Sequence, residues 1–452
     1  MSYTNIKITY FILCIIIMGC TKNETTFHQD IKYIIHEKCA VCHHPKGAGP
    51  FSLITYQDLI KRADMIKEVI EAKYMPPWPA DPEYRSFLYE KSLTPDEIEK
   101  ITIWLNGKQQ KGEWTNNSFL DSLLVKDEKR KPDLQLTMKQ SHITNSTNQD
   151  QFLMMKFPFE LEKDTFIRQI EFVPGNTQIV HHINAHLITY SSTEKTNLFD
   201  GEYIVDTELF SDEACFKKLN ILNDSGEYPV LTPSVSNYLP GSEQTIYPTG
   251  IGGFTAKKQN IILVNDFHYA PTPYSVKDSS YFNIYFSKHP PKRKIQETQL
   301  GTFGISKINP PLIIPPNEIK KFTTRARITK DISLLTINPH MHLLGKSFLA
   351  YAVTINDDTI PLIKIDDWNF RWQYFYTFKK MLKIPAGSEI IVEATYDNTS
   401  NNPDNPFSPP TTVSERVNFN GRGSMKTSNE MLQFIINYLP YEEGDEDIHL
   451  GI

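Results

Sequence analysis

Apolar residues recur at helical spacing in the first quarter of the chain. The two clearest stripes lie between residues 27 and 35 and between residues 59 and 70. A third stripe begins at Thr94, in a Thr-Pro-Asp-Glu sequence that combines a capping residue, a proline and a glutamate at the positions favoured at a helix start. Gly107 ends this third stripe. The pattern predicts a small α-helical domain over residues 21–113.

The pattern changes after a polar, highly charged segment at 114–132, which we expect to be a linker. Short runs rich in Val, Ile, Phe, Tyr and Thr then recur between Pro, Gly, Asn and Asp residues. Clear examples are 152–160, 166–173, 261–269 and 389–396. Such runs predict β-sandwiches. A His-Pro-Pro-Lys-Arg-Lys sequence interrupts the pattern near 289–300, so we expect two domains, 133–298 and 299–452. The expected fold class is α plus mainly β, with the helical domain followed by two jelly-roll-like sandwiches.

The first 20 residues determine the expected compartment. Lys7 precedes an apolar run over 8–18, which is too short for a membrane-spanning helix and is typical of a signal peptide. Cys20 follows a small residue, as in a bacterial lipoprotein signal, so we expect residues 1–20 to carry that signal and Cys20 to be lipidated. An uncleaved N-terminal anchor is the alternative. Both readings export the rest of the chain to the periplasmic side or the cell surface. Thr21, in place of Asp, favours the outer membrane.

Composition narrows the possible partners. The chain has 452 residues, 22% charged residues and a net charge of −6, without a basic stripe, so we expect no nucleic-acid partner. Membrane contact is expected through the lipid anchor only. Four of the five cysteines have another place, two in the expected signal and two in a motif described next. Cys215 alone remains and cannot form an intramolecular disulfide, so stability must come from core burial.

Residues 39–43 read C-x-x-C-H, the motif for covalent attachment of haem c. Cys39 and Cys42 would add to the haem vinyl groups, and His43 would be an axial ligand to iron. A thioredoxin-like redox pair would need a βαβ surround, which the pattern does not predict. A zinc site would need a second Cys/His pair nearby. The motif and the expected export together predict haem c.

The second axial ligand should lie further along the same domain. Met75, in Tyr-Met-Pro-Pro-Trp, is the preferred candidate, because adjacent prolines hold it on an extended loop. Met65 lies on the second helical stripe, and we expect it in the core instead. Thioether ligation raises the haem potential, which suits an electron carrier. The segment 27–107 resembles a short class I cytochrome c.

Histidines stand out in the β-rich part of the chain. His340 and His342 would lie on the same face of a strand, because side chains alternate in direction, and they could chelate one metal ion. His268 stands in a Phe-His-Tyr sequence within a predicted strand. The alternative for each group is a buried histidine with a backbone partner.

Adjacent His181 and His182 would point to opposite faces of a regular strand. Both could bind one ion only where a bulge or a strand end turns one of them. By spacing alone, His182 with His186 is the more natural pair.

The order His-His, His-Tyr, His-x-His-Leu and a late Glu-Met is similar to that of the copper type II ascorbate-dependent monooxygenases, over roughly residues 150–440. Peptidylglycine α-hydroxylating and dopamine β-monooxygenases belong to this family. The resemblance implies two β-sandwiches with one copper on each, facing a solvent-filled cleft. It implies an electron-transfer copper on His181, His182 and His268. It implies an oxygen-binding, catalytic copper on His340, His342 and Met431. Met425 is the alternative to Met431, without the Asn-Glu context.

These ligand types suit copper, because neutral imidazole binds either oxidation state and a thioether favours Cu(I). The resemblance therefore implies a copper-dependent monooxygenase that hydroxylates a C–H bond of a small or peptide-like organic substrate with O2. An upstream donor would supply electrons through the tethered haem. A non-catalytic haem and copper electron-transfer lipoprotein is the alternative, and a scaffold with degenerate metal sites is a third.

The chain departs from the peptide hydroxylases of this family at two substrate positions. Those enzymes hold the substrate carboxylate with an Arg two residues before the His-x-His pair and a Tyr four residues after the Met ligand. Here the two positions are Asn338 and Ile435. Because the bidentate anchor is missing, we do not expect a glycine-extended peptide as substrate.

Overall fold

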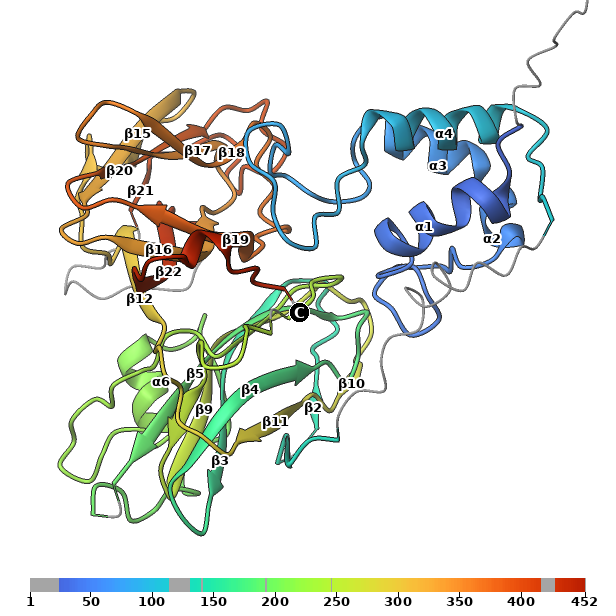
Figure 1. The fold of residues 1–452 in the computed structure, drawn as a ribbon. Helices are drawn as coiled ribbons and strands as arrows, with labels where there is room; N and C mark the ends of the chain where they lie inside the picture. The colour runs from blue at the N-terminus through green and yellow to red at the C-terminus, as the bar shows by residue number, and fades with distance from the viewer. Residues whose placement is uncertain are drawn as a thin grey trace, which may run out of the picture.

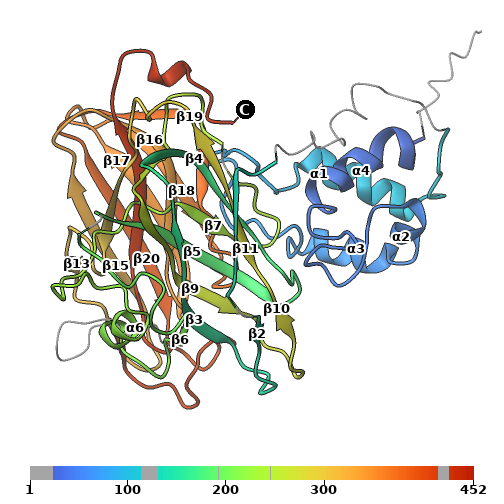
Figure 2. The same ribbon diagram turned by 90° about the horizontal axis from the view of Figure 1, so that it is seen from below.

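A computed structural model describes residues 24–113, 131–139, 141–191, 193–244, 246–415 and 427–451. In this part of the chain, strands predominate, and a helical segment lies at one side of two β-domains (Figures 1 and 2). The expected signal with Cys20, most of the expected linker, and Met425 lie outside the described residues. No helix among the described residues is both long and apolar enough to cross a membrane.

The helical segment has one core made by all its helices. Its elements are η1 (Phe27–Ile31), α1 (Lys32–Lys38), α2 (Tyr56–Ile60), α3 (Ala63–Glu71) and α4 (Pro95–Asn106). The predicted start of α4 is confirmed, because the Thr94 hydroxyl accepts from the Glu97 N–H and the Glu97 carboxylate accepts from the Thr94 N–H. Gly107 ends the helix, as predicted.

The second apolar stripe is divided between two helices. A two-residue turn separates α2 from α3. Ile66 and Ile70, one helical turn apart, are buried. Met65 precedes them and is 49% exposed, so the expectation that Met65 is a core residue is wrong.

The N-terminal β-domain consists of two antiparallel sheets that share a core. The five-stranded sheet is ordered β6 (Ile204–Asp206), β3 (Gln151–Glu160), β9 (Gln259–Tyr269), β5 (Val180–Tyr190), β7 (Ser236–Tyr238). The four-stranded sheet is ordered β1 (Leu134–Thr137), β11 (Tyr281–Ser287), β4 (Thr165–Val173), β8 (Phe254–Ala256). A short pair, β2 (His142–Ile143) and β10 (Lys277–Asp278), lies beside them. α6 (Asp212–Lys218), with the buried thiol of Cys215, contributes to a second core that also includes β3 and β9 residues.

The C-terminal β-domain repeats this arrangement. Its four-stranded sheet is ordered β12 (Gln296–Gly301), β22 (Gln433–Pro440), β16 (Ile332–His340), β19 (Tyr376–Ile384). Its five-stranded sheet is ordered β13 (Ile308–Asn309), β15 (Ile319–Arg327), β20 (Glu389–Asp397), β17 (Gly345–Val353), β18 (Thr359–Ile365). A pair, β14 (Ile313–Ile314) with β21 (Val413–Ser414), and the short η2 (Asp445–Asp447) complete it. β12 spans the boundary expected at 298/299, and its pairing places it in the C-terminal domain.

The four runs singled out from the sequence as strands are confirmed. They correspond to β3, β4, β9 and β20, and each observed strand extends the expected run by no more than two residues at an end. These runs combine β-branched and aromatic residues with flanking turn residues, and both signals are local.

Residues 77–90, here named the docking segment, extend from the helical segment onto the C-terminal β-domain (Figure 1). Ala80 pairs with Ile365, and Phe87 pairs with Phe378, as isolated antiparallel bridges. The side chains of Ala80 and Phe87 are part of the C-terminal core. A stretch that was expected within the helical domain therefore contributes to the core of a β-domain.

Phe87→Ala should destabilise the C-terminal β-domain. The Phe87 side chain is fully buried, and a Phe-to-Ala change in a core costs about 3–5 kcal/mol through lost burial and the cavity left behind. The measurement is the urea midpoint of the unfolding transition, followed by tryptophan fluorescence. Phe303→Ala is the matched control, because Phe303 is 53% exposed in the same domain. Equal shifts in the two variants would contradict the packing role of Phe87.

Candidate metal centres

A bulge in β5 turns two adjacent histidines to the same side. The pairing of β5 with β9 is irregular between Val180 and His182, and His182 lies opposite His268. A bulge gives two consecutive residues similar directions, which a regular strand does not allow. This is the condition under which His181 and His182 can approach one ion.

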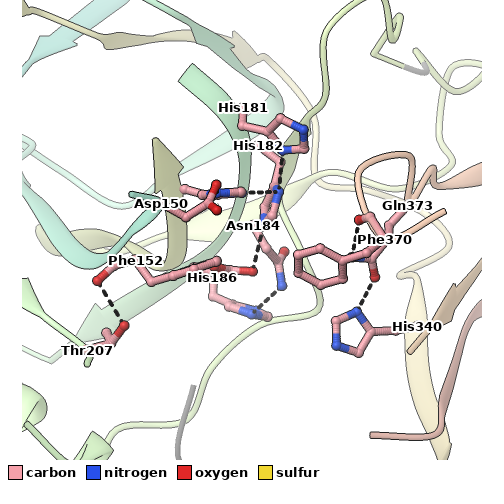
Figure 3. A network of polar contacts seen from close by, with 12 residues as sticks. Asp150, Phe152, His181, His182, Asn184, His186, Thr207, His340, Phe370 and Gln373 are labelled. Carbon is pink, nitrogen blue, oxygen red and sulfur yellow. Dashed lines mark hydrogen bonds and ion pairs between the residues drawn. The ribbon is translucent and has the colours of Figure 1, made fainter. Parts of the chain in front are cut away.

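The ligand atoms of His181, His182 and His268 lie within 4.8 Å of one another. The Nδ1 of His182 is 3.1 Å from the Nδ1 of His181 and 3.3 Å from the Nδ1 of His268. Two imidazoles cannot both donate across such a contact, and three nitrogens that converge in this way fit a metal ion. The structure therefore brings together the three residues expected for the electron-transfer copper, here named the three-histidine cluster. Two of them, His181 and His182, are labelled in Figure 3.

Two carboxylates hold the far sides of these rings. The Nε2 of His182 is 3.0 Å from Asp266, and the Nε2 of His268 is 2.7 Å from Asp150. An Nε2–H that donates to a carboxylate leaves Nδ1 as the lone-pair donor for a metal ion. The sequence analysis missed both acids. Asp266 could have been found from the sequence, because it lies two residues before His268. Asp150 could not, because it directly precedes β3 and is far from His268 in the chain.

Burial favours the neutral form of His181 and His268. Desolvation, with the nearby His182 and His268 rings, lowers the pKa of His181 to about 2. Desolvation also lowers the pKa of His268, although Asp150 opposes the shift. Burial alone would raise the pKa of Asp266, but the His182 ring lowers that pKa below its usual range. Neutral His181 and His268 rings near an ionised Asp266 suit a bound cation.

His186 does not join His182. Its Nδ1 is 2.9 Å from the backbone carbonyl of Thr232. The pairing favoured by spacing alone is therefore not observed, because the bulge places His181, and not His186, beside His182. His186 matches the alternative of a histidine with a backbone partner.

Asp266→Ala should weaken metal binding by the three-histidine cluster. Loss of a carboxylate that orients a ligand histidine typically costs about 10–100-fold in metal affinity. Asp266→Asn should lose less, because its amide oxygen can still accept from His182 Nε2. The measurement is copper retention against a graded chelator. Equal affinity in wild type and Asp266→Ala would show that the carboxylate does not support the site.

His340 and His342 form a second group at the end of β16. Their ring centroids are 5.1 Å apart at an interplanar angle of 87°. The His342 Nδ1 lies 2.7 Å from the Asn429 carbonyl, which can only accept, so His342 carries its proton there. The His340 Nδ1 contacts the Gln373 side-chain oxygen. The Nδ1 of each ring therefore faces a protein acceptor, the arrangement of a histidine that binds a metal ion through Nε2.

Glu430 links these histidines to Met431. Its buried carboxylate accepts from the backbone N–H of His342 (2.9 Å), Leu344 (2.7 Å) and Met431 (3.3 Å). Burial raises the pKa of Glu430 to about 8, although the three N–H groups oppose the shift. Tyr396 donates to the Met431 carbonyl, and the Met431 side chain is buried. The sequence analysis used Glu430 only as context for Met431, and the structure shows that it is a positioning residue.

Glu430→Gln should loosen the second group. A glutamine has one acceptor oxygen, and its NH2 would face an N–H donor, which leaves buried groups unpaired at a cost of about 1–3 kcal/mol. We expect reduced copper binding at His340 and His342, with the haem content unchanged. Copper analysis against Glu318→Gln, an exposed control in the same domain, tests this. A copper content equal to that of the control would remove Glu430 from the site.

Both groups border one cleft between the β-domains, with a volume of about 960 Å³. His182 and Asp266 line it from the N-terminal domain, and His340 and Met431 line it from the C-terminal domain. Figure 3 shows His340 with Gln373 apart from the His181 and His182 rings. The cleft gives a substrate and O2 a common space with both candidate centres.

The haem motif directly follows α1, and its donor atoms fit an attached haem. The Nδ1 of His43 is 3.0 Å from the Phe51 carbonyl, which leaves Nε2 for iron. A Cβ on Gly49 would lie 2.6 Å from His43 Nδ1, so only glycine allows this close approach of the loop. A backbone-oriented imidazole beside two cysteines is the donor set that haem c attachment requires.

The rival uses of the two thiols fit less well. Burial raises the pKa of Cys39 to about 12 and also raises the pKa of Cys42. A redox-active dithiol needs a lowered pKa, so these thiols do not resemble a thioredoxin-like pair. A zinc site would need three or more His, Cys, Asp or Glu ligands close together. Within the described ranges the three-histidine cluster is such a group, and it includes neither cysteine.

Met75 lies on the loop after α3, half-buried, with its N–H bonded to the Val69 carbonyl. Its axial role stays a prediction.

Comparison with known proteins supports the copper monooxygenase family. Residues 303–405 match the family model "Copper type II ascorbate-dependent monooxygenase, C-terminal domain", and this segment contains His340 and His342. The match indicates a copper-dependent monooxygenase in general. It does not extend to the three-histidine cluster, the haem motif or the lipid anchor.

Other comparisons add little. No curated protein matches the chain. Among solved structures, the infectious bursal disease virus VP2 subviral particle is 9% identical, covering 72% of this chain and 85% of that chain, with a TM-score of 0.16. The structure of infectious bursal disease virus Gx strain is also 9% identical, covering 73% and 86%, with a TM-score of 0.16. Likeness at this level carries no argument about fold or function.

Proposed function

We propose that this protein is a copper-dependent monooxygenase that hydroxylates a C–H bond of an organic substrate, with electrons supplied through a haem c on its helical segment. The observation that carries the proposal is the pair of candidate copper centres on one cleft. Two proposed ligands of one centre, His340 and His342, lie in the segment that matches the family.

The two centres have different proposed roles. His181, His182 and His268 hold the electron-transfer copper, because three neutral imidazoles suit both oxidation states. His340, His342 and Met431 hold the catalytic copper, where the thioether favours Cu(I). Copper bound at these positions supplies one-electron steps and the reaction with O2. The carboxylates and carbonyls around the imidazoles determine which ring nitrogen faces the metal ion. Glu430 holds the backbone at His342 and at Met431, on both sides of the second centre.

The cleft favours a substrate without a carboxylate near the second centre. Asn338 and Ile435 face each other across β16 and β22, and both line the cleft. The Asn338 amide donates to the Tyr374 carbonyl, so it is fixed by the protein. An amide beside an aliphatic side chain lacks the charge needed to anchor a carboxylate. We propose a small or peptide-like organic substrate that is neutral at this end.

The haem and the location complete the proposal. Cys39 and Cys42 attach haem c, with His43 and Met75 as axial ligands, and an upstream donor reduces it. Cys20 carries the lipid of an exported protein, which we place at the outer membrane. No nucleic acid takes part.

The first test is the copper-to-iron ratio of the soluble protein, matured with haem c and truncated after Cys20. The proposal expects about two copper ions per haem iron and rapid O2 consumption after reduction. Bound copper that does not react with O2, with or without candidate substrates, would favour a non-catalytic electron carrier. No bound copper under copper-replete conditions would overturn the proposal.

A further inference from the structure

A line of aromatic rings leads from the helical segment to the three-histidine cluster. The Trp78 ring is 5.1 Å from the Tyr374 ring, between centroids. The Tyr374 ring is 6.3 Å from the Trp372 ring and nearly parallel to it, at 14°. The Trp372 ring is 6.4 Å from the His181 ring. All three separations lie in the range of packed aromatic pairs, roughly 4.5–7 Å. These rings are here named the aromatic chain.

The two ends of the aromatic chain lie where electrons would enter and leave. Trp78 is in the docking segment, and only two prolines separate it from Met75, the proposed axial ligand of the haem. His181 is a member of the three-histidine cluster. The aromatic chain therefore links the two proposed redox centres.

The packing holds the aromatic chain in a fixed geometry. The Tyr374 hydroxyl donates to the Pro77 carbonyl at 2.9 Å, and Tyr374 is buried. Trp78 also packs edge-on against Tyr376, with ring centroids 5.2 Å apart. A hydrogen bond and two ring contacts fix Trp78 on the C-terminal β-domain, so the spacing between rings does not depend on a mobile surface side chain.

The haem motif itself lies against the N-terminal β-domain. A Cβ on Gly241 would lie 2.5 Å from the Cys42 sulfur. The Thr177 hydroxyl donates to the carbonyls of Lys46 (3.0 Å) and Gly47 (3.2 Å). Thr177 precedes β5, the strand that carries His181. The helical segment therefore contacts both β-domains. The contact at Thr177 defines a second route from the haem motif to the three-histidine cluster, and the test must separate it from the first.

We propose that the aromatic chain is the electron route from the haem to the copper held by the three-histidine cluster. This inference rests on the proposed function, because it requires both redox groups. In each transfer, ferrous haem iron becomes ferric and one cupric ion becomes cuprous. No bond forms or breaks and no proton moves, and the external donor reduces the haem again. Electron tunnelling weakens steeply with distance, so short steps between π systems make the aromatic chain faster than a path through aliphatic side chains.

The test measures the transfer itself, without substrate and without O2. In the full-length protein loaded with haem c and Cu(II), a photochemical donor reduces the haem in a flash. The decay of the ferrous absorbance then gives the transfer rate, and the loss of the Cu(II) EPR signal confirms the acceptor. Trp372→Leu should slow this decay at least about tenfold, an added barrier of about 1.4 kcal/mol. Trp372→Phe, which keeps a ring, should restore part of the rate.

Two further variants distinguish the route from its surroundings. Tyr376→Leu removes one of the two ring contacts of Trp78 but none of the three steps of the aromatic chain, so its rate should fall clearly less than that of Trp372→Leu. Thr177→Val removes the hydroxyl contact to the haem motif and should also leave the rate near wild type.

Three results would overturn the inference. The first is an unchanged rate in Trp372→Leu with both metals present. The second is an equal loss in Tyr376→Leu, which would indicate domain docking as the cause. The third is a loss confined to Thr177→Val, which would indicate the other route. Failure to load copper or haem would instead count against the proposed function, and the metal analysis detects that separately.

Discussion

We expect Met431→Ala to abolish turnover and to leave the haem spectrum unchanged. Met431 supplies the thioether expected at the catalytic copper, and its side chain is buried where it borders the cleft. The Glu430 carboxylate accepts from the backbone N–H of both Met431 and His342, which ties the two residues together. Loss of a direct ligand should reduce turnover more than loss of an orienting group, which costs about 10–100-fold. Copper content should fall towards half, because the three-histidine cluster is intact.

Met431→Leu separates ligation from packing. Leucine keeps most of the volume and apolar surface of methionine, so the thermal midpoint should change little. The same substitution at Met381, which is buried in the core of the C-terminal β-domain but is not a proposed ligand, is the matched control. We expect Met381→Leu to keep wild-type turnover. Wild-type turnover in Met431→Leu would remove Met431 from the site and make Met425 the candidate to test.

We expect Cys42→Ala to prevent formation of the mature haem c, which is attached through two thioether bonds. With one thiol left, we expect a low yield of holoprotein and a haem α-band shifted by the unreacted vinyl group. Cys215→Ala is the matched control, because Cys215 is a buried thiol in another domain. Its haem content should equal that of wild type. The measurement is the haem-to-protein ratio together with the absorption spectrum after acid extraction.

His43→Ala extends the same test to the iron. The bond from His43 Nδ1 to the Phe51 carbonyl leaves Nε2 for iron, so removal of the ring should abolish the low-spin spectrum. The two proposed copper centres lie in other domains and should still load. A normal low-spin spectrum in His43→Ala would show that another residue binds the iron on that side.

The sequence predicted the elements with strong local signals. The start of α4 depends on Thr94 and Glu97, three residues apart, and β9 depends on a run rich in β-branched and aromatic residues. Such features need no knowledge of distant residues. The second helical stripe was predicted correctly at Leu59, Ile66 and Ile70. Met65 was not, because it directly precedes Ile66 and points about 100° away from the buried face of α3.

The candidate centres were predictable as ligand lists but not as geometry. The sequence nominated His181, His182 and His268 by resemblance, whereas spacing alone favoured His182 with His186. Only the pairing of β5 with β9 reveals the bulge that brings His181 to His182. The role of Glu430 was equally hidden, because its three N–H partners include residues more than eighty positions earlier in the chain.

The sequence by itself determined the kinds of element, the nature of the motifs and the chemistry of each donor. Side-chain type and short-range spacing specify these properties. Tertiary structure alone decided that the docking segment joins the C-terminal core and that Asp150 and Asp266 orient the histidines. It also decided that Trp78, Tyr374 and Trp372 line up towards His181. The physical reason is that these contacts join segments far apart in the chain, and packing between sheets, rather than local conformational preference, sets which of them meet.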